Sequence, residues 1–361
     1  MRLRWLSVRD YRNIAHLELT LDEGVNVVSG GNAEGKTNFL ESIWMLTGAK
    51  SFRTAHDAEL IRRGQTCARL DAVFYAEQRE KKLSLEIDAE GRRISLGGAP
   101  FKRAAAFAGC FCCVCFSPDD LFLVSGAPAE RRRFLDTALC QIYPSYLQNI
   151  RRLARQVAQK NALLKNAAYV GAALDLIESF DEEIAALTAA VTSVRSRYTA
   201  QLQEKARRYY ETLSGGLEQA DFRYGSTVFS DDDYSPQAAL AALAAARGDD
   251  MRAGFSTIGC HRDELEIRLC GENGRCYSSQ GQKRSLVLAM KLAEADIFES
   301  IVGEKPVLLL DDVLSELDEN RQTFLIDCLG GSQAVITGCD ETAIQSRIRA
   351  RIFRIKGGRL P

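Results

Sequence analysis

The stretch Gly30-Gly31-Asn32-Ala33-Glu34-Gly35-Lys36-Thr37 decides how this sequence is interpreted. Gly30 and Gly35 permit positive φ, so successive backbone N–H groups can surround a phosphate at the start of a helix, where the helix dipole favours negative charge. Lys36 reaches the β- and γ-phosphates of a nucleotide, and the Thr37 hydroxyl ligates Mg²⁺. The pattern predicts that residues 30–37 form a phosphate-binding loop for ATP.

The residues around this loop supply the context that it requires. Val25, Val27 and Val28 form an apolar run typical of a buried strand. After the loop, apolar residues recur at helical spacing, at Leu40, Ile43, Trp44 and Leu46. The sequence therefore predicts a strand, a loop and a helix in succession, as a phosphate-binding loop needs.

Strand-like segments lie on both sides of this unit. Upstream, the runs 3–8 and 17–21 predict two paired strands that feed the loop strand. Downstream, three runs separated by polar turns at Gln78 to Lys82 and Asp88 to Gly91 predict an antiparallel flap beside a parallel core. These three runs are residues 72–76, 83–87 and 93–96.

The composition is that of an ordinary globular protein, with 361 residues of which 46% are hydrophobic and 26% charged. Its formal net charge is −1, so any nucleic-acid binding must come from a local basic face. No apolar run reaches membrane-spanning length, and the N-terminus lacks the apolar core of a signal peptide. We therefore expect a cytoplasmic protein without a membrane partner.

The 11 cysteines are expected to be free thiols, metal ligands or catalytic groups, because a reducing compartment disfavours disulfides. The dense cluster Cys110, Cys112, Cys113 and Cys115 has two interpretations. It is either a metal site or a set of small packed hydrophobes. Packing is favoured, because neighbouring residues of the β-like run 107–116 point to opposite faces.

The chain changes character at Ser117-Pro118-Asp119-Asp120, which predicts a helix start with a capping hydroxyl and acids in the first turn. From Ala129 to Ala246 the pattern is mostly helical. One apolar stripe predicts a packed helical hairpin rather than a partner-binding helix. Its members are Leu174, Ile177, Ile184, Leu187, Val191, Val194, Tyr198 and Leu202.

Basic residues recur in this helical stretch. They are either solvated helix faces balanced by acids or a surface that contacts DNA phosphates. The triplet Arg131, Arg132 and Arg133 is the selected DNA-binding candidate. The other members are Arg151, Arg152, Arg155, Lys160, Arg195, Arg197, Lys205, Arg207 and Arg208.

A second motif, Ser278-Ser279-Gln280-Gly281-Gln282, precedes an apolar helical pattern. A serine and a glycine at a helix start present a hydroxyl and free N–H groups to an anion. Taken alone, the pattern is equally compatible with an ordinary capped helix.

A third motif is the apolar run Val307 to Leu310 that ends in Asp311 and Asp312. Carboxylates at the end of such a strand lie where open α/β sheets bind nucleotides. Asp311 is therefore expected to hold Mg²⁺, and a neighbouring acid to orient the attacking water. The runs 334–337 and 352–355 predict the remaining strands, so the catalytic elements come from both ends of the chain.

The order of these motifs, with Ser-Glu-Leu-Asp at 315–318, resembles the ABC/SMC-type ATPases. Longer stretches are similar to the RecF family of bacterial DNA replication and repair proteins over nearly the whole length. These are residues 31–38, Ser51-Phe52-Arg53-Thr54, Phe116 to Leu121, Glu130 to Asp136 and His261-Arg262-Asp263.

This resemblance implies an α/β fold: an ABC-type P-loop ATPase head, with a mixed sheet and an antiparallel flap, plus a mainly helical second lobe. Residues 1–116 and 305–361 would form the ATP-binding lobe I. Residues 117–304 would form lobe II, which carries the Ser-x-Gly-Gln motif.

The resemblance also implies an ATP-dependent homodimeric clamp of recombinational repair and replication restart. It would bind double-stranded DNA and single/double-strand junctions, act with RecR and RecO in loading RecA, and be a weak DNA-stimulated ATPase. Slow hydrolysis of ATP with Mg²⁺ would control dimerisation.

Carried over by position, Lys36, Asp311 and Asp312 would be the catalytic residues, and Thr37 and Asp311 would hold the metal. Ser279, Gln280, Gly281 and Gln282 would face the γ-phosphate bound to the other subunit. Three departures stand out: Ala33 replaces a glycine common in the superfamily, Cys260 replaces the usual proline, and Asp312 replaces the catalytic glutamate. His261 is either a functional or a structural histidine, and Thr337 has no assigned role.

Two other classes stay open at this point. One is the ATP-hydrolysing subunit of another ABC-type machine such as a transporter, against which the helical insert and the divergent serine motif argue. The other is a P-loop enzyme with a separate substrate, for which the sequence shows no second cluster of acids or histidines.

Overall fold

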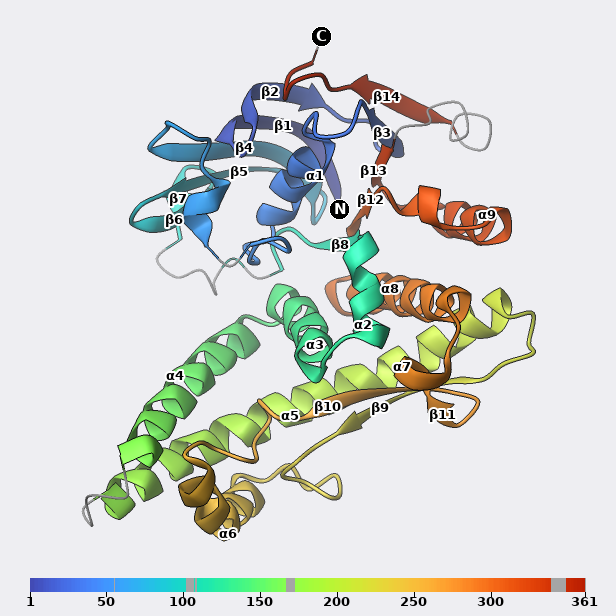
Figure 1. Cartoon of the computed structure of the whole chain (residues 1–361). Helices are drawn as coiled ribbons and strands as arrows, with labels where there is room; N and C mark the ends of the chain where they lie inside the picture. Colours follow the sequence, from blue (N-terminus) through green and yellow to red (C-terminus); the bar gives the residue numbers. More distant parts are fainter. Residues whose placement is uncertain (55, 102–106, 108, 167–172, 339–348, 361) are drawn as a thin grey trace.

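A computed structural model describes residues 1–54, 56–101, 107, 109–166, 173–338 and 349–360. An antiparallel sheet and a parallel sheet lie at one end of the molecule, and a long helical region lies at the other (Figure 1). Within the described residues, none of the helices combines the length and the apolar character needed to cross a bilayer.

The antiparallel sheet has six strands in the order β2-β1-β4-β5-β6-β7. The three strands expected in the flap are confirmed, but the turn expected at 78–82 is wrong. β4 pairs Ala76 with Arg79 of β5, and the turn is only Glu77 and Gln78, whose positive φ values of 51° and 58° suit a two-residue hairpin. The strands are β1 (Arg2–Tyr11), β2 (Ile14–Thr20), β4 (Cys67–Ala76), β5 (Arg79–Asp88), β6 (Gly91–Leu96) and β7 (Ala99–Pro100).

The parallel sheet has five strands in the order β14-β3-β13-β12-β8. It is separate from the antiparallel sheet, so the paired strands β1 and β2 precede the loop strand in sequence but do not share its sheet. The parallel strands are β3 (Val25–Ser29), β8 (Cys113–Phe116), β12 (Val307–Asp311), β13 (Ala334–Gly338) and β14 (Ala350–Arg354).

The clustered cysteines lie in and beside β8. Cys112, Cys113 and Cys115 are buried in the core, and burial raises the pKa of Cys112 to about 12 by disfavouring the thiolate. Across the described residues, no group of three or more His, Cys, Asp or Glu side chains has the arrangement of a metal site. Their burial shows that Cys112, Cys113 and Cys115 pack as small hydrophobic residues in this core.

The two faces of the parallel sheet are covered by different layers. α1 (Lys36–Met45) and the antiparallel sheet share one hydrophobic cluster with Val28, Leu309 and Val335. α8 (Gln280–Val302) shares the other cluster with Val27, Leu308 and Ile336. α9 (Glu319–Cys328) follows β12 and contacts α8. The first and second motifs of the sequence thus begin helices on opposite faces of one sheet.

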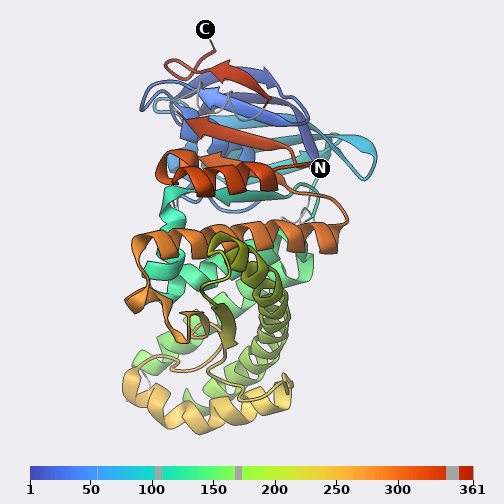
Figure 2. The same cartoon turned by 90° about the vertical axis from the view of Figure 1, so that its right-hand side faces the viewer.

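The helical region is built around α5 (Ala173–Leu213), which packs against α4, α6 and α8. α4 and α5 form the expected helical hairpin (Figure 1), and Figure 2 shows the helical region below the sheets after a turn of the view. The further helices are α2 (Phe122–Ser125), α3 (Pro128–Ile142), α4 (Pro144–Asn166), α6 (Pro236–Ala253) and α7 (Gly274–Tyr277). At the expected helix start, the 3₁₀ turn Pro118–Leu121 has Ser117 and Asp120 in a capping box.

A small three-stranded sheet interrupts the helical region and was not expected from the sequence. It consists of β9 (Ala220–Gly225), β10 (Glu264–Leu269) and β11 (Glu272–Asn273). β9 pairs with β10 from Ala220 opposite Leu269 to Gly225 opposite Glu264. A six-residue strand is difficult to recognise inside a helical pattern when its partner lies far away in sequence, as Glu264 does from Gly225.

Candidate nucleotide-binding site

The phosphate loop lies between the end of β3 and the start of α1. Three of its residues have positive φ: Gly30 at 153°, Ala33 at 65° and Gly35 at 109°. The two glycines adopt the conformations expected for them, whereas Ala33 has a left-handed backbone that is uncommon for a residue with a side chain. The loop therefore keeps the positive-φ glycines that the sequence predicted at its two ends.

Lys36 occupies the mouth of this loop. Its Nζ donates hydrogen bonds to the carbonyl oxygens of Gly30 at 2.7 Å and Gly31 at 2.9 Å. The side chain is held directly beside the N–H groups that open toward an anion. A phosphate oxygen at the same place would accept hydrogen bonds that Lys36 Nζ here donates to the two carbonyl oxygens.

Thr37 and Asp311 meet beside the loop. The Thr37 hydroxyl donates to Asp311 Oδ1 at 2.9 Å, and the Thr337 hydroxyl donates to the same oxygen at 2.7 Å. Hydroxyl and carboxylate oxygens are the donor atoms that Mg²⁺ prefers, so this pair fits the expected metal position. Thr337, which had no assigned role, is buried and orients the acid.

Asp312 adopts a left-handed backbone with a φ of 54°. Its N–H donates to Thr337 Oγ1 at 3.0 Å, and its Oδ1 accepts from Ser315 Oγ at 3.2 Å. The residue is exposed, next to the buried Asp311. An exposed carboxylate held by its backbone at this edge is suited to orienting a water molecule.

Asn13 contacts the phosphate loop from the turn between β1 and β2. Its Nδ2 donates to Ala33 O at 3.2 Å, and its Oδ1 accepts from Asn38 Nδ2 at 2.7 Å. A Cβ on Gly35 would lie 3.0 Å from Asn13 Oδ1. Sequence reasoning did not select Asn13, because a single asparagine in a turn is not distinctive.

The serine motif caps α8. Ser279 Oγ accepts from Gln282 N at 3.2 Å, and Gln282 Oε1 accepts from Ser279 N at 2.7 Å. Ser279 and Gln280 are exposed, and Gln282 also donates to Glu218 at 2.6 Å. The motif therefore has the geometry of an ordinary capping box and also presents its first turn to solvent.

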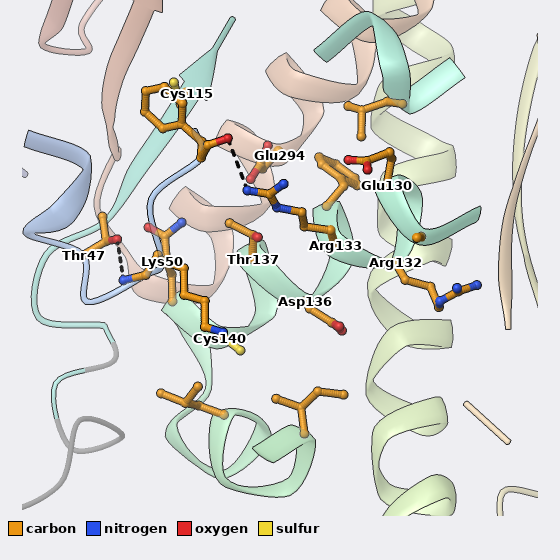
Figure 3. A pocket seen from close by; sticks show the side chains of 18 of the residues that line it. Thr47, Lys50, Cys115, Glu130, Arg132, Arg133, Asp136, Thr137, Cys140 and Glu294 are labelled. Carbon is orange, nitrogen blue, oxygen red and sulfur yellow. Dashed lines mark hydrogen bonds between the residues drawn. The ribbon is translucent and has the colours of Figure 1, made fainter. Parts of the chain in front are cut away.

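The arginine triplet on α3 does not form one surface patch. Arg131 is buried, and its guanidinium makes two hydrogen bonds of 2.7 Å to Glu264. Arg132 donates to Asp263 O at 2.8 Å, and Arg133 donates to Phe52 O at 3.3 Å. Figure 3 shows Arg132 and Arg133 pointing in different directions from α3. Only Arg132 and Arg133 keep any exposure for a phosphate contact.

Two other basic candidates are internal. Lys160 is fully buried between Asp181 and Asp250, with Nζ 2.7 Å from an oxygen of each. Arg195 is buried and contacts Asp136 at 2.7 Å and Cys260 O at 2.6 Å. The interpretation of these two residues as DNA contacts is therefore wrong, because buried charges are retained only with their partners.

His261 is a packed histidine. Its Nε2 lies 3.4 Å from Ser256 O, and burial lowers its pKa to about 4 because the charged imidazolium is disfavoured. The next acid, Asp263, is fully buried and accepts from Tyr224 OH at 2.6 Å and from Thr227 N at 2.7 Å. These contacts give Asp263 a structural role in the helical region.

The fold and the site together define a P-loop ATPase of the ABC/SMC head type. The Smc head domain from Pyrococcus furiosus has the same fold, with a TM-score of 0.54 and 14% identity over 99% of this chain and 94% of that one. The family model described as the RecF/RecN/SMC N terminal domain matches residues 2–354.

Similarity to one branch of this class is much stronger. The DNA replication and repair protein RecF of Exiguobacterium sp. is 35% identical over 99% of this chain and 98% of the relative. The solved structure of the recombination mediator protein RecF-ATPrS in the RecFOR pathway superposes with a TM-score of 0.91 and 31% identity, covering 99% of this chain and 97% of that chain. The chain belongs to the RecF family of DNA replication and repair proteins.

The ion pair of α3 makes a stability prediction. Replacing Arg131 by alanine removes two charge-assisted hydrogen bonds to Glu264, whose side chain is 30% exposed, and a hydrogen bond to a charged group contributes about 1.5–3 kcal/mol. We expect the free energy of unfolding in urea to fall by about that amount. Arg133→Ala is the matched control on the same helix and should change stability by less than about 1 kcal/mol. Equal stability of both variants would contradict the structural role of Arg131.

Proposed function

We propose that this protein is an ATP-dependent DNA-binding clamp of recombinational repair and replication restart. The observation that carries the proposal is the meeting of Thr37 and Asp311 at 2.9 Å beside an open phosphate loop. The similarity to RecF extends over the inserted helical region, which supports this function over that of another ABC-type machine. The experiment that tests it is an ATPase assay with and without DNA.

In the proposed mechanism, the backbone N–H groups of residues 30–37 and Lys36 bind the phosphates of ATP. Thr37 and Asp311 would hold Mg²⁺, which would neutralise charge on the β- and γ-phosphates during hydrolysis. Thr337 keeps the Asp311 carboxylate oriented, and Asp312 orients the attacking water. A solved relative is described as RecF-ATP in the RecFOR pathway, which supports ATP as the ligand of this chain.

Dimerisation is the next part of the proposal. In one chain, α1 and α8 lie on opposite faces of the parallel sheet, and the start of α8 is exposed. A γ-phosphate on the loop of one copy would be bound by the exposed serine motif, residues 279–282, of a second copy. The lobes at 1–116 with 305–361 and at 117–304 share one continuous hydrophobic cluster. We therefore expect the two lobes of one chain to move together when two copies close on ATP.

The proposed protein and DNA partners come from the RecF family. The solved relatives are described as recombination mediators in the RecFOR pathway, which supports RecR and RecO as partners here. DNA would contact exposed basic side chains at gaps and junctions through its phosphates. The reaction would take place in the cytoplasm, and turnover would be weak and DNA-stimulated.

Replacing Asp312 by asparagine tests the role of that acid. The amide cannot take up a proton from water, so hydrolysis in a single-turnover experiment should slow by about 10²-fold while ATP affinity is kept. Glu316→Gln is the matched control, because this acid lies in the same segment but pairs with Arg284 at 3.6 Å. An unchanged rate for the Asp312 variant together with a slow Glu316 variant would move the role to Glu316.

Two variants should fail differently in dimerisation. Lys36→Ala should lose ATP binding and hence the dimer. Ser279→Arg should bind ATP but remain a monomer, because the added side chain blocks the exposed start of α8. Sedimentation with a slowly hydrolysed ATP analogue measures both effects, and Glu90→Arg, on the exposed turn between β5 and β6, is the control. Normal dimerisation of the Ser279 variant would exclude the sandwich.

DNA binding should depend on phosphate contacts. The affinity should fall steeply with salt and show little base preference. For the double variant Arg132→Ala/Arg133→Ala, the slope of log affinity against log salt should fall by about one unit per lost contact. Arg252→Ala, an exposed arginine on α6, is the control. If the double variant binds DNA like the control, the basic face lies elsewhere, with Arg151 and Arg155 on α4 as the next exposed candidates.

A further inference from the structure

The turn after β14 lies against the back of the phosphate loop. β14 pairs in parallel with β3 up to Arg354 opposite Ser29, and Ile355 N donates to Ser29 O at 2.9 Å. The chain then turns, with Lys356 N bonded to Arg359 O at 2.9 Å. Residues 355–358 are thereby placed beside Gly30 and Glu34.

Glu34 places a negative charge in a loop that is proposed to bind negatively charged phosphates. The structure shows which groups its carboxylate and its carbonyl oxygen contact. Its carboxylate accepts a hydrogen bond from the backbone N–H of Gly357, and its carbonyl oxygen accepts from Gly358 N at 2.9 Å. Hydrogen bonds from backbone N–H groups to a carboxylate are of the stronger, charge-assisted kind. The side chain is thus tied to the turn.

The glycines of these segments are explained by the same contact. A Cβ on Gly30 would collide with the carbonyl oxygen of Ile355. A Cβ on Gly358, whose φ is 72°, would lie 2.6 Å from Asn13 O. Gly357 has a similar φ of 56° but has no atom within 4 Å of its Cβ position. At Gly30 the loop touches the backbone of the turn at 355–358, and at Gly358 this turn touches the backbone of the β1–β2 turn. Gly357 makes no such close contact.

The loop needs such support. Ala33 precedes Glu34 and has a left-handed backbone with a φ of 65°. A residue with a side chain keeps this conformation only where surrounding contacts over-determine it. Asn13 holds Ala33 O from one side, and the hydrogen bonds of Glu34 hold the next residue from the other.

We propose that Glu34 and residues Ile355 to Gly358 form a back latch that holds the phosphate loop in its phosphate-binding conformation. Glu34 is then a positioning residue whose side chain acts through the loop backbone and does not touch the nucleotide. This inference rests on the proposed ATP-binding function. Because the latch orders N–H groups that surround the β-phosphate, it affects ATP and ADP alike.

The first test compares Glu34→Ala with Glu34→Gln. The amide oxygen of glutamine still accepts from Gly357, whereas alanine removes the contact. In calorimetry, Glu34→Ala should bind both ADP and ATP about tenfold more weakly, and Glu34→Gln should be close to wild type. In steady-state assays the KM for ATP of the alanine variant should rise with kcat unchanged. Glu90→Ala, an exposed acid on a distant turn, is the control.

The second test uses the paired glycines. Gly357→Ala and Gly358→Ala impose the same left-handed backbone cost, but only the second pushes against Asn13 O. Gly358→Ala should weaken ADP binding about tenfold relative to Gly357→Ala. Combining Glu34→Ala with Gly358→Ala should cost less than the sum of the two, because both open the same latch.

The outcomes separate the latch from the proposed function. If wild-type protein does not bind ATP, the proposed function fails. If wild type binds ATP and Glu34→Ala binds equally well, the latch is overturned. If Glu34→Ala does not fold, equal ADP affinity of the two glycine variants overturns it. A lower thermal midpoint without a change in nucleotide affinity would also overturn it, since that is the result of a purely structural contact.

Discussion

The contact of Asp311 with Thr37 and Thr337 is the interaction on which the site depends. Thr37 lies 274 residues from Asp311 in sequence, yet its hydroxyl donates to the carboxylate at 2.9 Å. Parallel pairing of β3, β13 and β12 places the ends of these strands at one edge of the sheet, where open α/β sheets bind ligands. Separate hydrophobic clusters on the two faces hold this alignment.

Part of the positive charge in the helical region is used inside the protein. Lys160 joins α4 to acids on α5 and α6, Arg195 joins α5 to α3, and Arg131 joins α3 to β10. Buried cations of this kind stay charged only with a partner. A basic surface for a phosphate backbone would therefore be built from exposed arginine and lysine side chains, and in a chain with a net charge of −1 it is necessarily local.

Backbone strain is present at two positions of the nucleotide site. Ala33 and Asp312 are residues with side chains that nevertheless have positive φ, at 65° and 54°. The first is held by Asn13 and the back latch, the second by Thr337 and Ser315. Such strain persists where neighbouring contacts offset its energetic cost. It keeps the binding groups oriented before a ligand binds. The loop is thus shaped by its surroundings as much as by its own glycines.

The sequence by itself determined the phosphate loop, the strand that ends in Asp311, the capped start of α8 and the α4–α5 hairpin. These features follow from local backbone preference and from the spacing of apolar residues, which a short window contains. Only the tertiary structure decided that Arg131 is buried against Glu264, that Thr337 orients Asp311, and that residues 355–358 support Glu34. Each of these depends on a partner more than 20 residues away, and the packing that joins such partners leaves no mark in the local pattern of either one.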